Sequence, residues 1–365
     1  MQSKFVKILF VCLVTQLYSC SASAQQKRQN HYTIEGRTET TNDGVILIGS
    51  ASSVAFSFTG DSVSIGLKSL TPKNSYVSLE LDGNYIGRFK IEAGNEKWIP
   101  IPAKDKKSIH HLSVFKATEA ANGGVLFIGT TVKQLPKETV KKTKKIEFIG
   151  NSITCGMGND AKEIPCGTGE WYDQHNAYWA YGPIISRKLN VDFQLSSVSG
   201  IGMYRNWNDE HNLEPIMPQV YGNLYLDTNT QKPYISNFQP DIISICLGTN
   251  DLSDGDGIKP RLPFNEEKYI SNYVNFIKML LDRNLNSQIV LLNSPMVNGD
   301  RAVVFEKCLE KVKSHFNADK KHKPILIFKF KPMLPNGCTT HPDIDDHKIM
   351  AAQYAPFLKN ILDEK

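Results

Sequence analysis

The sequence contains no Cys-x-x-Cys pair and no His-rich ligand spacing, so neither a structural nor a catalytic zinc site is expected. It has no Gly-Lys-Ser/Thr phosphate loop. It also lacks the basic face interleaved with aromatics that nucleic-acid binding requires. Six lysines fall between residues 133 and 145, so the rest of the chain is close to neutral despite a formal net charge of +5. We therefore expect no cofactor and no nucleic-acid partner.

The N-terminal segment has the features of an export signal. Two lysines precede an apolar run at residues 8–14, and Ala-Ser-Ala follows at residues 22–24. Because this run is too short to span a membrane, we expect residues 1–24 to be a cleaved signal peptide. A second route is open, since the sequence Leu-Tyr-Ser-Cys ending at Cys20 resembles a bacterial lipoprotein box and would carry a lipid anchor. Both routes take the protein out of the cytoplasm, to the periplasm, the cell surface or the medium.

Five cysteines would remain after that cleavage. An odd number in an oxidising compartment leaves at least one free thiol. Cys246 and Cys308 lie in apolar runs, which predicts buried thiols. Cys155, Cys166 and Cys338 lie in loops, where two of them can form one disulfide. The pairing stays open at the level of the sequence.

The chain divides into two parts with different hydropathy patterns. Within residues 30–135, short segments alternate apolar and polar residues and are separated by turn dipeptides such as Asp-Gly and Gly-Gly. This pattern predicts a β-sandwich of the jelly-roll type. Residues 136–145 are rich in lysine and begin with a proline, so they are expected to connect two domains.

Residues 146–365 alternate apolar strands with helices. The strand candidates lie at residues 146–150, 191–200, 241–248, 288–294 and 324–330, and the helix candidates include residues 177–189, 266–283 and 345–362. This alternation predicts an α/β domain in which helices cover both faces of a parallel sheet. Ligands bind such sheets outside the carboxyl ends of the strands.

Four chemically informative positions follow strand candidates and can converge at that edge: Ser152, Gly200, Asn250 and His341. Ser152 is open to three roles, a helix cap, a phosphate ligand or a nucleophile, and the missing phosphate loop argues against the second. His341 favours the third role, because a neutral imidazole can take the proton of a serine hydroxyl while an ester is cleaved. His347, in the following helix, is expected to serve packing or to lie at the surface.

Asn250 stands in the segment Gly-Thr-Asn-Asp directly after an apolar strand. It can be a turn residue and nothing more, or its side-chain amide can donate a hydrogen bond to a developing oxyanion. The backbone N–H groups of Ser152 and Gly200 can do the same. Loss of one such donor costs about 3–4 kcal/mol of transition-state stabilisation.

Ser152 in GNSIT, Gly200 in SGIG, Asn250 in GTND and His341 in HPD resemble the four ordered blocks of the SGNH, or GDSL-type, hydrolases, which have a flavodoxin-like fold. The preceding sandwich and the segments GNSITCGMG and GCTTHP narrow the resemblance to carbohydrate esterase family 2, bacterial deacetylases of plant polysaccharides. It implies that Ser152 is the nucleophile and His341 the base. It also implies an oxyanion hole of the Ser152 N–H, the Gly200 N–H and the Asn250 amide.

One position departs from the superfamily pattern. Asp usually stands three residues before the catalytic His, and here that residue is Cys338. Some members of family 2 work as a Ser-His dyad in which a backbone carbonyl orients the imidazole, and the resemblance implies the same for His341. Helix capping and the helix dipole explain the acidic residues that follow His341.

Three aromatic residues, Trp171, Tyr204 and Trp207, lie in Gly- or Asn-rich segments where a platform for sugar rings is expected. We therefore expect an exported esterase that removes O-acetyl groups from plant polysaccharides such as xylan and glucomannan through an acyl-enzyme. Two alternatives stay open. One is an esterase of the same type that acts on another acetylated glycan, and the other is a carbohydrate-binding protein with little catalysis.

Overall fold

The computed structural model describes residues 32–104, 108–132 and 143–364. The expected signal peptide with Cys20, and most of the expected connector, lie outside these residues. Within the described ranges, no helix combines the length and the hydropathy that crossing a bilayer requires.

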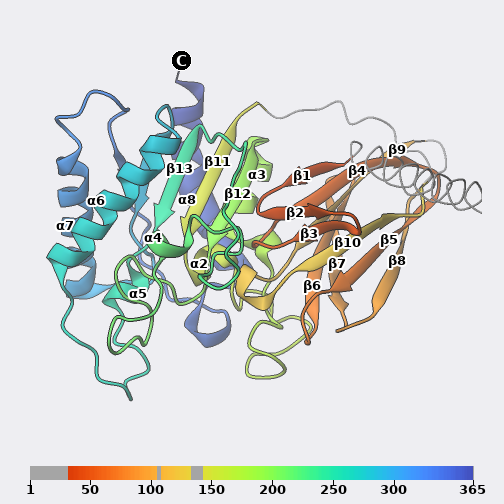
Figure 1. The fold of residues 1–365 in the computed structure, drawn as a ribbon, viewed down its shortest axis with the longest axis horizontal. Coiled ribbons are helices and arrows are strands. Elements are labelled where there is room, and N and C mark those ends of the chain that lie inside the picture. The colour runs from red at the N-terminus through yellow and green to blue at the C-terminus, as the bar shows by residue number, and fades with distance from the viewer. Residues whose placement is uncertain (1–31, 105–107, 133–142, 365) are drawn as a thin grey trace, which may run out of the picture.

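The first part of the described chain forms two antiparallel sheets that share one core (Figure 1). The first sheet has the order β1 (Thr33–Glu35), β4 (Ser53–Thr59), β9 (Ile109–Lys116), β6 (Ser75–Leu81) and β7 (Asn84–Ile91). The second has the order β2 (Thr38–Thr41), β3 (Gly44–Leu47), β10 (Val125–Thr130), β5 (Ser62–Ser69) and β8 (Glu96–Pro102). Inward-facing side chains such as Phe56, Val77 and Phe127 are at most 1% exposed. The β-sandwich predicted from the alternating hydropathy pattern is therefore confirmed.

The second part contains a five-stranded parallel sheet. Its order is β12 (Asp192–Ser197), β11 (Lys145–Gly150), β13 (Ile242–Cys246), β14 (Gln288–Leu292) and β15 (Leu326–Phe328). The first strand in sequence, β11, lies between β12 and β13, so the strand order reverses there, as in flavodoxin-like sheets. The crevice outside the carboxyl ends of β11 and β13 is therefore the place where a ligand site is expected.

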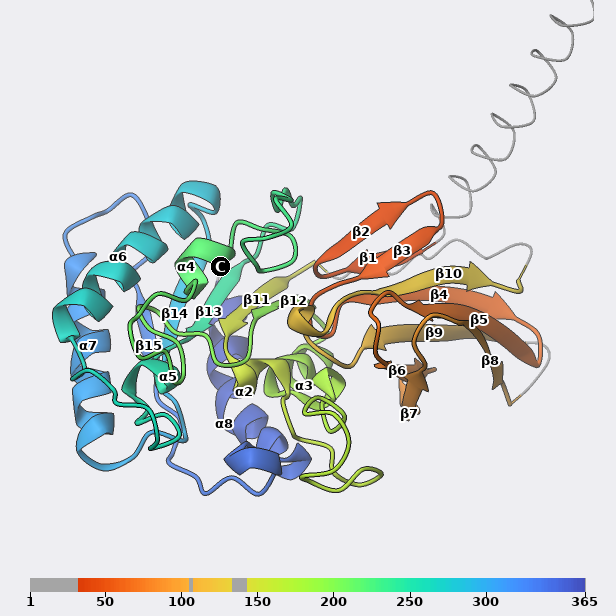
Figure 2. The same cartoon turned by 60° about the horizontal axis from the view of Figure 1, so that its bottom comes forward.

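Helices cover both faces of this sheet (Figure 2). One face carries α3 (Tyr181–Leu189) and α8 (Ile344–Asp363), and the other carries α6 (Glu266–Arg283) and α7 (Gly299–His315). The side chains of β13 alternate between the two layers, because Ile243 and Ile245 pack with α6 and α7 whereas Ile242 packs with α3 and α8. A strand covered on both sides is mostly apolar, which explains the nearly continuous apolar run in the sequence. Short segments complete the structure: η1 (Ala120–Asn122), α2 (Ser152–Cys155), η2 (Ala177–Trp179), α4 (Met217–Val220), α5 (Thr249–Leu252) and η3 (Cys338–Thr340).

The helix expected at residues 177–189 is interrupted. It is divided into η2 and α3 by Ala180, whose ψ of 153° is extended. Pro183 explains the break, because proline is tolerated in the first turn of a helix but not in its interior. By contrast, the helix predicted at residues 266–283 is confirmed as α6.

The sandwich packs against β12, at one edge of the parallel sheet (Figures 1 and 2). Arg37, which is fully buried, donates to the carbonyl oxygens of Tyr221 at 3.0 Å and Asn223 at 2.7 Å. Arg88 of β7 donates to the carbonyl oxygen of Asp173 at 2.6 Å. Because each buried guanidinium contacts hydrogen-bond acceptors of the other half, these contacts fix the two halves relative to each other.

Candidate active site

Ser152 and His341, 189 positions apart in the sequence, meet at the carboxyl end of β11. The Oγ of Ser152 lies 2.8 Å from Nε2 of His341. Ser152 is 6% exposed and the His341 side chain is partly buried, so the pair is largely shielded but remains reachable. This is the geometry in which an imidazole can take a hydroxyl proton.

The backbone at Ser152 turns sharply from strand to helix. Asn151 caps α2, because its side chain accepts a hydrogen bond from the Ile153 N–H at 3.2 Å. Gly150 permits the turn, since a Cβ at this residue would lie 2.0 Å from Oγ1 of Thr154. The cap role considered for Ser152 therefore belongs to Asn151, and the serine hydroxyl is left for the imidazole.

The second ring nitrogen of His341 faces the main chain. Its Nδ1 lies 2.9 Å from the carbonyl oxygen of Thr339. Because a carbonyl can only accept, Nδ1 carries the proton and Nε2 presents its lone pair to Ser152. Thr339 has a φ of 51°, an unfavourable value for a β-branched residue, and such backbone strain clusters at functional sites. A main-chain oxygen thus occupies the position where an aspartate is usual.

A disulfide between Cys166 and Cys338 ties the His341 loop to the loop that follows α2. It gives the pairing that the sequence left open. The other described cysteines are free and buried: Cys155, Cys246 and Cys308. The prediction of buried thiols at the two apolar positions is therefore confirmed.

Burial lowers the pKa of His341 below its ordinary value of 6.5, although the hydrogen bond to the Thr339 carbonyl acts in the opposite direction. Removing the imidazolium from water disfavours the charged form. The ring is therefore mostly neutral at neutral pH and can accept a proton through Nε2.

Gly200 and Asn250 reach the same edge from β12 and β13, the two strands that flank β11. Gly200, in the loop after β12, has a φ of 77°, which favours glycine. Asn250, in α5 after β13, donates through Nδ2 to the carbonyl oxygen of Ile201 at 2.7 Å. This bond holds Asn250 beside the Gly200 loop and uses one of the two N–H bonds of the amide. The second N–H bond is the one that a bound oxyanion would require.

Asp251 is a structural residue that the sequence does not reveal, and it fixes the loop that follows Gly200. Its buried carboxylate accepts backbone hydrogen bonds from Met203 at 2.9 Å, Tyr204 at 2.8 Å and Arg205 at 3.2 Å. Three N–H donors are thereby satisfied by one side chain from α5. An Asp beside Asn in a turn segment gives no sequence signal that separates this role from turn chemistry.

Two of the three expected sugar-binding aromatics are exposed near the site. Trp207 is 45% exposed, and its backbone N–H donates to the Gly200 carbonyl oxygen at 2.7 Å. Trp171 is 48% exposed, and its ring packs edge-on against that of His175, with the centroids 4.9 Å apart. Both rings therefore remain available as platforms.

The expectation for Tyr204 is wrong. Its side chain is only 3% exposed and lies in the hydrophobic core, where its hydroxyl accepts from the Asn265 N–H at 3.0 Å. The Asp251 carboxylate draws this part of the loop inward. A buried ring cannot stack on a sugar, so Tyr204 is a packing residue.

The residues that follow His341 serve the fold. Asp343 caps α8, its side chain accepting from the Asp346 N–H at 2.8 Å. His347 is fully buried, and its Nδ1 accepts from the Tyr181 N–H at 3.2 Å. Of the two roles considered for His347, the structure supports packing.

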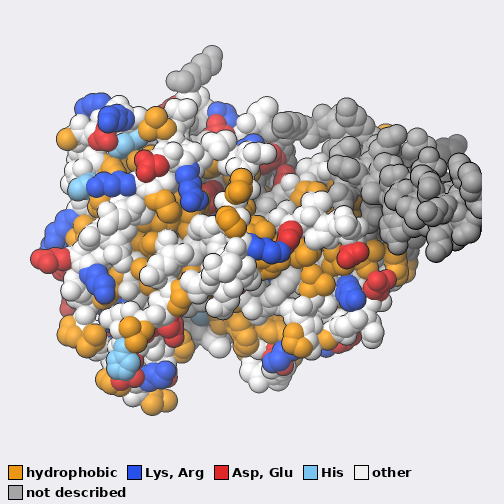
Figure 3. Space-filling view, viewed as in Figure 1, with side chains coloured by type: hydrophobic (Ala, Val, Ile, Leu, Met, Phe, Trp, Pro, Cys, Tyr) orange, Lys and Arg blue, Asp and Glu red, His pale blue; other side chains and the backbone are white. Residues whose placement is uncertain are grey.

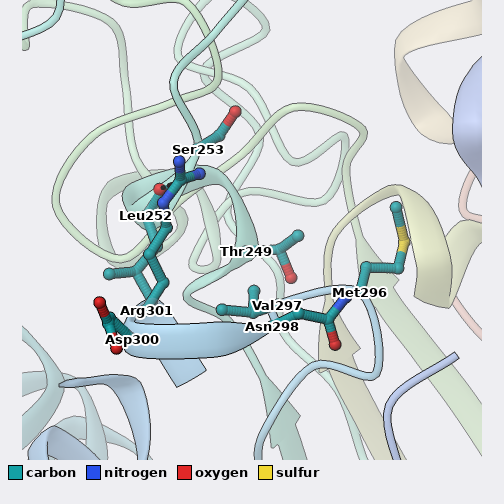
Figure 4. A pocket seen from close by; sticks show the side chains of 8 residues that line it. All are labelled: Thr249, Leu252, Ser253, Met296, Val297, Asn298, Asp300 and Arg301. Atoms are coloured by element: carbon teal, nitrogen blue, oxygen red, sulfur yellow. Dashed lines mark hydrogen bonds between the residues drawn. The ribbon is translucent and has the colours of Figure 1, made fainter. Parts of the chain in front are cut away.

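A cavity of about 540 Å³ opens beyond the carboxyl ends of β13 and β14 (Figure 4). It is lined by residues that follow β13 and β14: Thr249, Leu252, Ser253, Met296, Val297, Asn298, Asp300 and Arg301. The lining combines apolar surface with hydrogen-bonding groups, as sugar sites do.

Two family descriptions match this chain. Residues 34–138 match "Carbohydrate esterase 2 N-terminal", and residues 146–354 match "GDSL-like Lipase/Acylhydrolase". An acetylxylan esterase / glucomannan deacetylase of Cellvibrio japonicus is 30% identical over 251 residues, which are 66% of this chain and 67% of that protein. A second protein of the same description and organism is 25% identical over 363 residues, covering 97% of this chain and 96% of that protein. A solved family two carbohydrate esterase from Clostridium thermocellum, in complex with cellohexaose, has a TM-score of 0.80 at 25% identity and covers 91% of this chain and 99% of its own.

Proposed function

Because the chain belongs to carbohydrate esterase family 2, with a GDSL-like hydrolase domain, we propose that it removes O-acetyl groups from plant polysaccharides such as xylan and glucomannan. The names of the two Cellvibrio japonicus relatives support this substrate class. The observation that carries the proposal is the 2.8 Å contact between Ser152 Oγ and His341 Nε2. A protein that only binds carbohydrate would not need this serine and this histidine in contact.

Acylation begins when Ser152 Oγ attacks the carbonyl carbon of the acetyl group and His341 Nε2 takes the hydroxyl proton. The negative charge forms on the carbonyl oxygen. The Ser152 N–H, the Gly200 N–H and the second N–H bond of the Asn250 amide stabilise it. The tetrahedral intermediate collapses as the bond to the sugar oxygen breaks, and His341 returns the proton to that oxygen.

Deacylation repeats these steps with water. His341 takes a proton from the water molecule, whose oxygen attacks the acetyl-serine, and acetate leaves as Ser152 recovers its proton. The Thr339 carbonyl holds the proton of His341 on Nδ1 throughout and stabilises the imidazolium that forms in each half-reaction. After one turnover Ser152 and His341 have recovered their starting protonation states, because the serine proton has left with the sugar hydroxyl and a proton of the water molecule has replaced it.

Sugar rings of the polysaccharide stack on Trp171 and Trp207, the two exposed aromatics near the site. The cavity beyond β13 and β14 takes a further part of the polysaccharide. The face in Figure 3 supports a neutral partner, because basic and acidic side chains of the described residues are interspersed on it.

A polymeric substrate fits an enzyme that acts outside the cell. The N-terminal sequence supports export, either by cleavage after residue 24 or by lipidation at Cys20. Mass spectrometry of the mature N-terminus separates the two routes, since only lipidation leaves a modified cysteine as the first residue.

We expect the purified protein to release acetate from acetylated xylan and glucomannan faster than from acetylated pectin, peptidoglycan or sialic acid. We expect this preference because both Cellvibrio japonicus relatives are named as esterases of acetylated xylan and glucomannan. Acetate is measured at matched acetyl concentrations. Faster release from one of the other esters would show that the substrate is another acetylated glycan. Tight glycan binding without acetate release would make the protein a carbohydrate-binding module.

Trp207→Ala tests whether the polysaccharide lies on this side of the site. Loss of one stacking contact should raise KM on the preferred polysaccharide about 3- to 10-fold and leave kcat/KM for p-nitrophenyl acetate unchanged. Trp98 of β8 is also 45% exposed and is the matched control, because Trp98→Ala should change neither value. An unchanged KM in the Trp207 variant would remove this residue from the binding surface.

The pH profile tests the state of His341. Catalysis needs the neutral ring, so activity is present above the pKa of His341 and is lost as the pH falls through it. Because burial lowers this pKa, the acid limb of kcat/KM should have its midpoint below pH 6.5. The profile is measured with p-nitrophenyl acetate from about pH 5 to 8, with circular dichroism as the check that the fold persists. A midpoint at or above 6.5 would contradict the assignment.

A further inference from the structure

Glu119 belongs to the sandwich but lies inside the hydrolase half. It directly precedes η1, in the segment that joins β9 to β10, and its side chain is 0% exposed. Figures 1 and 2 show this segment close to the carboxyl end of β12 and to α2. Burying a carboxylate destabilises the folded protein unless other groups compensate its charge, so the contacts of Glu119 are informative about its role.

The carboxylate of Glu119 contacts three segments of the candidate active site: the loop after β12, α2 and the loop that contains His175. Its Oε2 accepts from the backbone N–H of Ser199, directly before Gly200, at 2.6 Å. The same oxygen accepts from the Cys155 thiol at 3.4 Å, and Cys155 is the last residue of the helix that begins with Ser152. A short N–H bond to a charged oxygen is among the stronger hydrogen bonds in proteins.

The other oxygen, Oε1, lies 3.5 Å from Nε2 of His175. Nδ1 of His175 accepts from the Gly158 N–H at 3.3 Å, so the proton of the neutral ring is on Nε2, the nitrogen nearer to Glu119. Burial alone raises the pKa of Glu119, but the nearby His175 ring and the hydrogen bond from the Ser199 N–H outweigh it and keep the pKa below its usual value. Glu119 is therefore an ionised acceptor in the interior.

We propose that Glu119 is a positioning residue for the oxyanion hole, supplied to the hydrolase half by the sandwich. By fixing the Ser199 N–H, its carboxylate holds the peptide that carries the Gly200 N–H in the donating orientation. Through Cys155 it also anchors the helix of the nucleophile. This role rests on the oxyanion hole of the proposed function, and it makes the two halves one catalytic unit. An error of about 1 Å in such a site can lower the rate about 100-fold.

Glu119→Gln tests the role, because it keeps the shape and removes the charge. We expect kcat for p-nitrophenyl acetate to fall about 10- to 100-fold while KM stays within about threefold. Affinity for phenylboronic acid, whose adduct with a serine carries the tetrahedral negative charge, should fall by a similar factor. A purely structural defect would lower the unfolding temperature without this parallel loss.

Glu147→Gln is the matched control. Glu147 is a buried carboxylate in the first half of β11 and accepts from Ser196 Oγ at 2.6 Å and Tyr221 hydroxyl at 2.9 Å. Its variant should lose stability but keep kcat within about twofold, because it contacts none of the loops at the carboxyl end of the sheet. A folded Glu119→Gln enzyme with wild-type kcat, or an equal loss in both variants, would overturn the proposal.

If Glu119→Gln does not fold, the hydrogen bond between Ser199 and Glu119 can be tested by NMR on the wild-type protein. A 2.6 Å bond to a carboxylate should move the Ser199 amide proton clearly downfield in the NMR spectrum of the full chain, and an ordinary shift would overturn the proposal. Failure of the proposed function is recognised separately. In that case Ser152→Ala would keep its activity, whereas failure of the Glu119 role alone leaves Ser152→Ala inactive and Glu119→Gln normal.

Discussion

Replacing Ser152 by alanine is expected to lower kcat for p-nitrophenyl acetate about 10⁵- to 10⁶-fold, to the limit of detection. The substitution removes the only atom through which an acetyl-enzyme can form at this site. His341 cannot compensate, because Nε2 then has no hydroxyl proton to take. Initial rates at saturating ester, measured with enough enzyme to see one turnover per hour, define the residual activity.

The variant should remain folded. Ser152 stands at the first position of α2, where Asn151 supplies the cap, so loss of its hydroxyl removes only the 2.8 Å contact to His341. One such bond contributes about 1 kcal/mol to stability. Thermal unfolding followed by circular dichroism should therefore show a shift of only a few degrees.

Ser186→Ala is the matched control for Ser152→Ala. Ser186 is a fully buried serine in α3, and its hydroxyl donates to the Gly182 carbonyl oxygen at 2.9 Å. Its removal costs a comparable hydrogen bond far from the carboxyl edge of the sheet, so the activity should stay at the wild-type level. Turnover above about 1% of wild type in Ser152→Ala would remove the nucleophile assignment.

The convergence of the site could be predicted because it follows from topology. Ser152, Gly200 and Asn250 each come directly after an apolar segment, and the carboxyl ends of parallel strands lie at one edge. The hydropathy pattern alone was enough to predict the strands and the layers. The order of the strands, which puts β11 between β12 and β13, came from the family resemblance.

The resemblance implied that a backbone carbonyl orients His341, but the identity of the groups that orient the site residues could not be predicted. The carbonyl that accepts from His341 belongs to Thr339, which adopts a positive φ that its residue type does not signal. Cys166 and Cys338 are 172 positions apart, and three loop cysteines allowed more than one pairing. Glu119 lies among alanines in a segment of the other domain, so only the packed structure brings it to Ser199.

Tyr204 illustrates how local composition misleads. Its Gly- and Asn-rich neighbourhood is typical of an exposed loop. A single buried carboxylate, Asp251, collects the backbone N–H groups of three consecutive residues and turns this loop into the core. Such long-range contacts decide whether an aromatic in a loop faces solvent, and Trp207 three residues later does.

Asn250→Ala is expected to lower kcat about 10²- to 10³-fold, with little change in KM. The amide contributes mainly when negative charge forms on the acetyl oxygen, so its loss raises the barrier by about 2.7–4 kcal/mol without weakening ground-state binding. Asn250→Asp should be at least as damaging, because a carboxylate at this position repels the oxyanion. Both variants are measured by steady-state kinetics on p-nitrophenyl acetate and on the preferred polysaccharide.

A structural effect must be separated from this catalytic one, since Asn250 also donates to the Ile201 carbonyl oxygen at 2.7 Å. Asn293→Ala provides the comparison. Asn293 is buried after β14, where it donates to the Phe330 carbonyl oxygen at 3.2 Å and accepts from the Phe330 N–H at 2.7 Å. Its loss should destabilise the fold at least as much as Asn250→Ala and leave kcat near the wild-type value.

Asn250 is the decisive donor to test because the other two are backbone groups. Only proline would delete the N–H of Ser152 or Gly200, and its ring fixes φ at about −65°. At Gly200, where φ is 77°, any other residue would change the backbone as well. The loss on removing Asn250 therefore measures one donor directly. If kcat falls less than tenfold in a folded Asn250→Ala enzyme, the oxyanion does not form beside this amide, and the carbonyl of the substrate must enter the site from another direction.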